Sequence, residues 1–152
     1  MKKLYIAYGS DMHTQNMKKK CPGARVIAKS WLHDYQLAFH GLLHAARATV
    51  VPSEGSEVPV IIWEISEHDE AVLDVFEGAR AHFRKKETMV VEVDGKMEEA
   101  LIYVLPPGPV GRPLDLHLRS IAHGYREFNL DIRILNQAVL RSYAQLELGR
   151  AQ

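Results

Sequence analysis

The amino-acid sequence predicts an α+β fold built around a mainly antiparallel or mixed sheet. Short runs of apolar and β-branched residues occupy most of the first two thirds of the chain, whereas two longer segments with helical spacing occupy the last third. The dipeptide Asp94-Gly95 separates two β-type runs and is typical of a two-residue hairpin turn, which makes the flanking strands antiparallel. This order of elements is that of helices packed on an antiparallel or mixed sheet.

Length and composition favour one domain that spans residues 1–152. Of the 152 residues, 47% are hydrophobic and 25% are charged, so a single core can bury most of the apolar surface. Lysine plus arginine equal aspartate plus glutamate at 19 each, which argues against nucleic acid or an anionic membrane as a partner. The balance favours a small neutral or zwitterionic ligand.

Cysteine content and hydropathy predict a cytoplasmic protein. Cys21 is the single cysteine, so the chain forms no internal disulfide, and we expect a reducing compartment. The apolar run at residues 4–9 is too short for the core of a signal peptide. No stretch of about 18 apolar residues predicts a membrane span.

The first half of the chain is expected to contain four strands and one helix. A short aromatic-rich strand ends at Gly9-Ser10-Asp11. The helix that follows takes Ser10 or Asp11 as its N-cap and stops at Cys21-Pro22-Gly23. The strands are expected at residues 4–8, 35–40, 48–51 and 58–65, with a hairpin turn at residues 52–56.

The second half is expected to contain three helices and one hairpin. The first helix starts at Ser66 and ends at Gly78, with Leu73 and Phe76 on its apolar face. The hairpin strands are residues 87–93 and 97–105, and the last two helices are residues 114–128 and 131–148. We expect the apolar face of the last helix to pack on the sheet, although it would also serve a dimer.

The segment Tyr8-Gly9-Ser10-Asp11, called the 8–11 loop below, is the first candidate site. A strand ends there in a glycine turn and a helix begins, so free backbone N–H groups point outward at the start of the helix. Such groups bind carboxylates and phosphates. The structural alternative is that Ser10 or Asp11 only caps the helix. The motif lacks the length of a P-loop and the glycines of a dinucleotide fingerprint.

Glu77 is the second candidate, because it lies at the end of a helix, just before Gly78. It follows Leu73 by one helical turn, which places it at the rim of the apolar face. The negative end of the helix dipole and partial burial beside Phe76 both predict a raised pKa, as a general acid/base near neutral pH requires. The alternative is a solvated surface glutamate.

Other chemistry is less well supported by the sequence. Ser10 lacks the Gly-x-Ser-x-Gly context of a hydrolase nucleophile. The histidine pairs His40/His44 and His117/His123 have no accompanying cysteine pair or zincin glutamate, so no metal site is predicted.

Several short motifs in register resemble the γ-glutamylcyclotransferase superfamily over nearly the whole chain. They are Leu4-Tyr5-Ile6-Ala7-Tyr8-Gly9-Ser10, Cys21-Pro22, Leu73-Asp74-Val75-Phe76-Glu77-Gly78, Phe83-Arg84, Tyr103 and Gly124-Tyr125. The resemblance implies a mixed, mainly antiparallel, small barrel-like sheet that curls around a cavity and has flanking helices. It places the 8–11 loop at the mouth of the cavity and Glu77 inside it, and it implies no cofactor.

The resemblance also implies a reaction and roles for individual residues. The backbone donors of Gly9, Ser10 and Asp11 hold the α-carboxylate of a γ-glutamyl amide, and Glu77 moves protons. The substrate's own α-amine attacks its γ-carbonyl, so that an amine or amino acid leaves and 5-oxoproline forms. The remaining candidates for the pocket lining are Tyr8, Phe83, Tyr103 and Tyr125. The alternative for the three tyrosines is a place in the core, which is the more usual one for tyrosines in strands and helices.

Three departures from the family pattern bear on this reading. Asp11 stands where asparagine is more frequent, and a negative charge aimed at a bound carboxylate would weaken binding. Phe83 replaces a frequent tyrosine, and His33-Asp34-Tyr35 replaces a Gly-Tyr turn. Two other functions stay open: a binding module that no longer turns over a γ-glutamyl ligand, and a hydrolase that produces glutamate. The sequence leaves the oligomeric state open.

Overall fold

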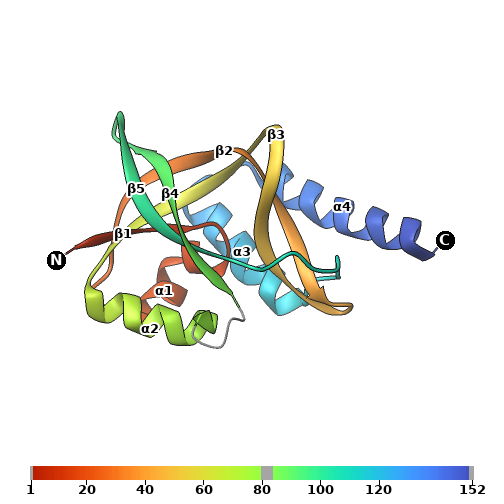
Figure 1. Cartoon of the computed structure of the whole chain (residues 1–152), viewed down its shortest axis with the longest axis horizontal. Helices are drawn as coiled ribbons and strands as arrows, with labels where there is room; N and C mark the ends of the chain where they lie inside the picture. The colour runs from red at the N-terminus through yellow and green to blue at the C-terminus, as the bar shows by residue number, and fades with distance from the viewer. Residues whose placement is uncertain (1, 80–83, 151–152) are drawn as a thin grey trace.

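A computed structural model describes residues 2–79 and 84–150, except for the side chain at position 150 (Figure 1). A strand, a short 3₁₀ helix and an α-helix form the N-terminal part, two long strands follow, and a helix, a hairpin and two helices complete the chain. The elements are β1 (Lys3–Ala7), η1 (Ser10–Met12), α1 (Thr14–Lys20), β2 (Arg25–Leu42), β3 (Ala45–Ile65), α2 (Glu67–Glu77), β4 (Lys85–Val93), β5 (Lys96–Val104), α3 (Asp115–Glu127) and α4 (Ile132–Arg150).

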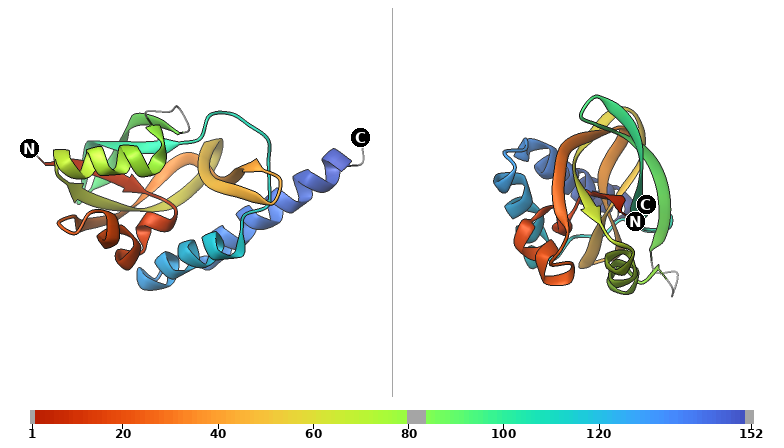
Figure 2. Two further views of the ribbon diagram at one scale, coloured as in Figure 1. Left: turned by 90° about the horizontal axis from the view of Figure 1, so that it is seen from below. Right: turned by 90° about the vertical axis from the view of Figure 1, so that its left-hand side faces the viewer.

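The five strands form one sheet in the order β2-β3-β1-β5-β4. Only the β1–β5 pair is parallel, and the other pairs are antiparallel. The sheet curls strongly, so that its two edge strands, β2 and β4, approach each other without forming a ladder (Figure 2). The Ser30 hydroxyl on β2 donates to the Glu92 carbonyl oxygen on β4 at 2.6 Å. The predicted α+β fold with a mixed, curled sheet is confirmed.

The hairpin turn predicted at residues 52–56 is wrong, because β2 pairs with β3 on both sides of that segment. His33 pairs with Glu57 and Tyr35 with Pro52, so residues 53–56 bulge out of a ladder that continues. Asp34 has a φ of 66° there, and its carboxylate accepts a hydrogen bond from the Gly55 N–H at 3.0 Å. Asp34 thus adopts the left-handed conformation for which glycine is the usual residue.

Strand β2 begins at Arg25, ten residues before the predicted strand. Only Leu32 is fully buried between residues 25 and 34, while Val26 and Trp31 are more than one-third exposed. The apolar alternation that identifies a strand in sequence is therefore absent from this half of β2. The actual turn between β2 and β3 is Leu43-His44.

The predicted boundaries of α2 and of the β4–β5 hairpin are close to the observed ones. Ser66 and Asp69 form a capping box, and Gly78 ends α2 in the left-handed conformation with a φ of 67°. Asp94 and Gly95 have φ values of 50° and 85°, as the tight hairpin turn requires.

The last two helices, α3 and α4, lie on the same side of the sheet as the 8–11 loop (Figure 2). Leu135 and Ala138 on α4 are buried, and α4 contacts β2, as expected for its apolar face. Helix α3 packs directly on η1, where Ile121 and Met12 are fully buried. Within the described residues, no helix is long and apolar enough to cross a membrane.

Gly124 permits the close approach of α3 to η1, because a Cβ atom there would lie 2.9 Å from Met12 Cβ and 3.2 Å from His13 N. We expect Gly124→Ala to lower the free energy of unfolding by about 1–3 kcal/mol, measured by urea denaturation. Gly149→Ala on α4 is the matched control, since nothing lies within 4 Å of its Cβ position. Equal free energies of unfolding for the two variants would contradict this prediction, because they would show that α3 and η1 can move apart at little cost.

Candidate active site

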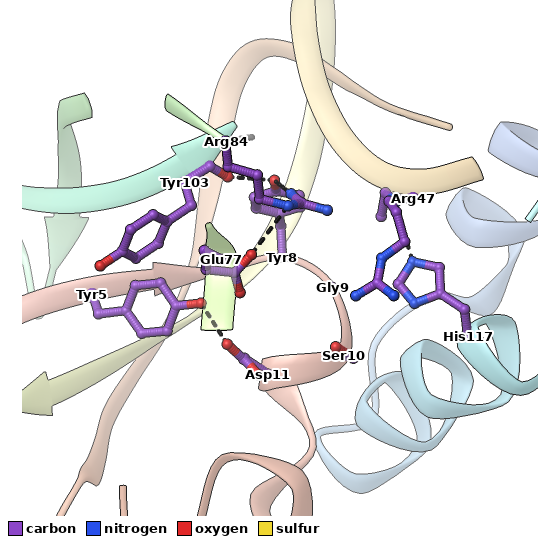
Figure 3. A pocket seen from close by; sticks show the side chains of 11 residues that line it. Tyr5, Tyr8, Gly9, Ser10, Asp11, Arg47, Glu77, Arg84, Tyr103 and His117 are labelled. Atoms are coloured by element: carbon purple, nitrogen blue, oxygen red, sulfur yellow. Dashed lines mark hydrogen bonds and ion pairs between the residues drawn. The ribbon is translucent and has the colours of Figure 1, made fainter. Parts of the chain in front are cut away.

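A pocket opens at the end of β1, where the 8–11 loop, α2 and the sheet meet (Figure 3). Aromatic, cationic and carboxylate side chains share its wall. The residues that line it are Tyr5, Tyr8, Gly9, Ser10, Asp11, Arg47, Ala48, Glu77, Arg84, Tyr103 and His117. The fold therefore brings together the 8–11 loop, Glu77 and Tyr103, as the sequence predicted.

The 8–11 loop turns into η1 and not directly into the predicted α-helix. Met12 N donates to Gly9 O at 3.1 Å and His13 N to Ser10 O at 3.2 Å, and α1 begins only after His13. The N-cap residues of η1 and α1 are Gly9 and His13, and neither caps its helix with its side chain, so the expectation that Ser10 or Asp11 caps the helix is wrong. Among residues 2–79 and 84–150, the N–H groups of Gly9, Ser10 and Asp11 find no acceptor. All three residues line the pocket.

The Asp11 carboxylate points away from these donors into a buried cluster. One oxygen accepts a hydrogen bond from the Tyr5 hydroxyl at 2.7 Å, and the other pairs with Lys20 Nζ at 2.7 Å. The Trp63 indole N–H donates to the Asp11 carbonyl oxygen at 3.0 Å. Asp11 is 4% exposed, so this ion pair is largely desolvated. The Asp11 carboxylate is thus paired with Lys20, although its charge still acts on Glu77.

We expect Lys20→Met to lower the free energy of unfolding by about 1–3 kcal/mol, because it leaves a buried carboxylate without its cation. Denaturant unfolding of this variant is compared with that of Lys19→Met, whose side chain is exposed on the same helix. The double variant Asp11→Asn/Lys20→Met removes both charges and keeps an acceptor for Tyr5, so it should regain most of the loss. A double variant no more stable than Lys20→Met alone would contradict the pairing.

Glu77 points into the pocket from the last turn of α2, one turn beyond the fully buried Leu73. Its Oε2 lies 3.0 Å from Arg84 Nε. Burial raises the pKa of Glu77; the Arg84 charge opposes this rise, Asp11 adds to it, and Lys20 and Arg47 oppose it. The direction agrees with the prediction, but one predicted cause is wrong.

Phe76 does not bury the Glu77 carboxyl group, because the Phe76 ring is 63% exposed and lies outside the pocket. Lys20 Nζ lies over the exposed Phe76 ring, 5.2 Å from its centroid. The buried tyrosines that share the pocket wall with Glu77 are Tyr5, Tyr8 and Tyr103 instead.

Arg84 holds two walls of the pocket together. It is 7% exposed, its Nε pairs with Glu77, and its Nη1 donates to the Tyr8 hydroxyl at 3.0 Å. The Tyr8 hydroxyl in turn donates to the carbonyl oxygen of Tyr103. Arg84 thus engages one oxygen of the Glu77 carboxylate and fixes its direction (Figure 3).

Of the other two tyrosines predicted to line the pocket, Tyr103 does so and Tyr125 does not. The Tyr103 ring stacks edge-on against Tyr5 at 5.8 Å, and its hydroxyl donates to Asp74 Oδ1 at 2.6 Å. Tyr125 does not line the pocket: it is fully buried on α3, and its hydroxyl has no partner among the described residues. Its predicted contact with a ligand is therefore not supported. Phe83 lies outside the described residues.

Arg47, Arg84 and His117 line the pocket but were not predicted from the sequence. The His117 Nε2 atom accepts a hydrogen bond from the Ala48 N–H at 3.1 Å. Burial lowers the pKa of His117 to about 4, with Arg47 and Arg84 adding to the effect, so the ring is neutral near pH 7. The adjacent pair Phe83-Arg84 was the available sequence signal for Arg84, whereas the other two residues reach the site only through strand pairing and helix packing.

Solved structures place this curled sheet and its flanking helices in one structural class. A structure named gamma-glutamyl cyclotransferase matches with a TM-score of 0.82 and 23% identity, over 91% of this chain and 86% of that one. YkqA from Bacillus subtilis matches with a TM-score of 0.77 and 17% identity, over 93% of this chain and 54% of that one. These likenesses define the fold.

Sequence comparison defines the family. The family model described as gamma-glutamyl cyclotransferase, AIG2-like, matches residues 5–125. Human gamma-glutamylcyclotransferase is 26% identical over 137 residues, which cover 85% of this chain and 73% of that protein. The bovine gamma-glutamylcyclotransferase is 29% identical over 85 residues, or 51% of this chain and 45% of that protein. The chain belongs to the AIG2-like gamma-glutamyl cyclotransferase family.

Proposed function

We propose that this protein is an enzyme of the γ-glutamylcyclotransferase type, which releases an amine or amino acid from a γ-glutamyl amide and forms 5-oxoproline. The observation that carries the proposal is Glu77, a carboxyl group enclosed by tyrosines, whose pKa is raised by burial. A carboxylate with a raised pKa accepts a proton and returns it near neutral pH.

The chemistry needs no external nucleophile. Glu77 takes a proton from the substrate's α-ammonium group, and the free amine attacks the γ-carbonyl carbon. The new C–N bond closes a five-membered ring, the old amide C–N bond breaks, and Glu77 returns the proton to the departing nitrogen. Holding the substrate in the attack conformation lowers the barrier of such a ring closure by several kcal/mol.

The 8–11 loop supplies the recognition of the γ-glutamyl group. The N–H groups of Gly9, Ser10 and Asp11, which lack acceptors among the described residues, are suited to the α-carboxylate. Tyr8 and Tyr103 form walls that keep the glutamyl chain folded. Arg84 orients the Glu77 carboxylate and leaves its second oxygen for the proton transfers.

The test is to incubate the purified protein with γ-glutamyl dipeptides, a γ-glutamyl alkylamide, γ-glutamyl-ε-lysine and glutathione, in EDTA and without added cofactor. We expect mass spectrometry to detect 5-oxoproline and the released amine in equal amounts. Release of glutamate instead would identify a hydrolase, and binding without any product would identify a binding module. Glu77→Gln protein, purified in the same way, controls for spontaneous cyclisation and for contaminating enzymes.

A further inference from the structure

The side chain of Asn16, on α1, reaches back to the 8–11 loop. Its Nδ2 atom donates to the Ser10 carbonyl oxygen at 3.2 Å, and the His13 N–H donates to the same oxygen at 3.2 Å. The bond from His13 is part of the turn of η1 itself, whereas the bond from Asn16 is an addition that the turn does not require. The Ser10 carbonyl group is therefore held by two donors, one from α1 and one from its N-cap residue.

The direction of the Asp11 N–H group follows from this contact. The Ser10 carbonyl and the Asp11 N–H belong to one planar trans peptide group, so they point in opposite directions. Because the carbonyl oxygen is held toward α1, the N–H of the same peptide is turned away from α1. Ser10 and Asp11 both line the pocket, and no acceptor for this N–H lies within the described ranges. Asn16 thus fixes the direction of a backbone donor at the pocket.

The same hydrogen bond makes the Asp11 N–H a stronger donor. A donor on the carbonyl oxygen draws electron density through the amide toward that oxygen, which leaves the amide proton more positive. Hydrogen bonds in such a chain strengthen one another by about 10–30%. The proposed ligand group is a carboxylate, and Asp11 and Glu77 place negative charge on the same pocket wall. A strong, well-directed donor offsets that charge.

Helix α3 fixes the position of Asn16 relative to the loop. Glu127 on α3 accepts hydrogen bonds from the Thr14 N–H at 2.9 Å and from the Thr14 hydroxyl, at the first residue of α1. The same carboxylate lies 3.0 Å from His13 Nδ1. The start of α1 is thereby held against α3, and Asn16 lies in the first turn after this anchor.

We propose that Asn16 is a positioning residue, which directs the Asp11 N–H toward the α-carboxylate of a γ-glutamyl ligand and strengthens it as a donor. This inference rests on the proposed function, in which the 8–11 loop holds that carboxylate. Asn16 does not line the pocket, so it acts through the Ser10–Asp11 peptide group. The affinity for γ-glutamyl compounds therefore depends on Asn16, whereas proton transfer by Glu77 does not.

The first measurement is titration calorimetry with γ-glutamyl-ethylamide, whose only carboxylate is the α-carboxylate, in the Glu77→Gln background, where turnover does not consume the ligand. We expect Asn16→Leu, which keeps the shape but removes the donor, to weaken binding by about threefold to tenfold. With Glu77 intact, the same change should raise KM by that factor and leave kcat unchanged. Gln15→Met is the matched control, because Gln15 is exposed on the same helix and lies outside the pocket.

The second measurement separates positioning from a general effect on the fold. In proton–nitrogen correlation spectra of the Glu77→Gln protein, binding of γ-glutamyl-ethylamide should displace the amide signals of Gly9 and Asp11. At saturating ligand, Asn16→Leu should reduce the displacement of the Asp11 proton signal and leave that of Gly9 in place. The Gly9 N–H belongs to the preceding peptide group, whose carbonyl Asn16 does not contact.

The outcomes distinguish the positioning role from the function on which it rests. Equal changes at the Gly9 and Asp11 signals would show that Asn16 only supports the loop, and would overturn the inference. An unchanged affinity of Asn16→Leu would overturn it as well. Binding that leaves the Asp11 signal of the Glu77→Gln protein in place would overturn the positioning role alone. If the Glu77→Gln protein binds no γ-glutamyl compound, the proposed function fails, and the role of Asn16 with it.

Discussion

Glu77→Gln is expected to lower kcat/KM for 5-oxoproline formation by about 100-fold to 10,000-fold, which is the usual range for loss of a general acid/base. Glutamine has the same shape and offers an oxygen to Arg84 Nε, but it neither accepts nor returns a proton at neutral pH. Substrate affinity should change by less than about threefold, because the α-carboxylate is assigned to the backbone of the 8–11 loop. Initial rates and calorimetric binding provide the two measurements.

Glu70→Gln is the matched control for this variant. Glu70 lies on the same helix and is paired with Lys3 at 2.6 Å and with Lys86 at 2.9 Å, but it does not line the pocket. Its replacement should leave the rate of 5-oxoproline formation unchanged. Wild-type turnover by Glu77→Gln would remove Glu77 from the mechanism.

Arg84→Met is expected to move the acid limb of the kcat/KM profile to higher pH by about 1–3 pH units. Burial already raises the pKa of Glu77, and the Arg84 charge at 3.0 Å is the foremost opposing cause. Without that charge the pKa of Glu77 rises further. Since Glu77 must be ionised to accept the ammonium proton, activity is then lost at a higher pH as the solution is acidified.

Folding stability gives an independent readout of the same variant. A carboxyl group whose pKa is raised by folding binds its proton more tightly in the folded state, so its ionisation costs stability as the pH rises above the unfolded-state value. Loss of Arg84 enlarges this cost. The free energy of unfolding of Arg84→Met, relative to wild type, should therefore be lower at about pH 8 than at about pH 5, and Glu77→Gln/Arg84→Met should lose this pH dependence.

Arg133→Met controls for the loss of an arginine in general, because Arg133 forms an exposed pair with Asp131 at 2.9 Å, outside the pocket. Its pH–rate profile should coincide with that of wild type. An acid limb that stays in place in Arg84→Met would show that the ion pair does not set the protonation of Glu77.

Local signals predicted those elements whose boundaries are set by a few neighbouring residues. The capping box at Ser66 and Asp69, the left-handed Gly78 and the hairpin at Asp94-Gly95 are all of this kind. The turn predicted at residues 52–56 failed because the same residue types also form a bulge, and only pairing with β2 distinguishes the two structures.

The parts of the candidate site that could be predicted are those formed by one short segment of the chain. The 8–11 loop and Glu77 are both marked by a glycine at the end of an element, so their positions could be inferred from nearby residues. Arg47 lies opposite His40 in the β2–β3 ladder, and His117 reaches the pocket through the packing of α3. No local pattern encodes those long-range contacts. The exposure of Phe76 depends in the same way on the rotation of α2 relative to the sheet.

The ion pair between Asp11 and Lys20 has a consequence for the substitutions that the chain tolerates. With asparagine at position 11, a lysine at position 20 is tolerated, because the Lys20 side chain is 17% exposed. Aspartate at position 11 without that lysine places a lone carboxylate in a buried site, which is costly. A chain with aspartate at position 11 therefore depends on Lys20, whereas a chain with asparagine there does not. With both residues present, loss of Lys20 alone costs stability, and an uncharged residue at position 11 removes that cost.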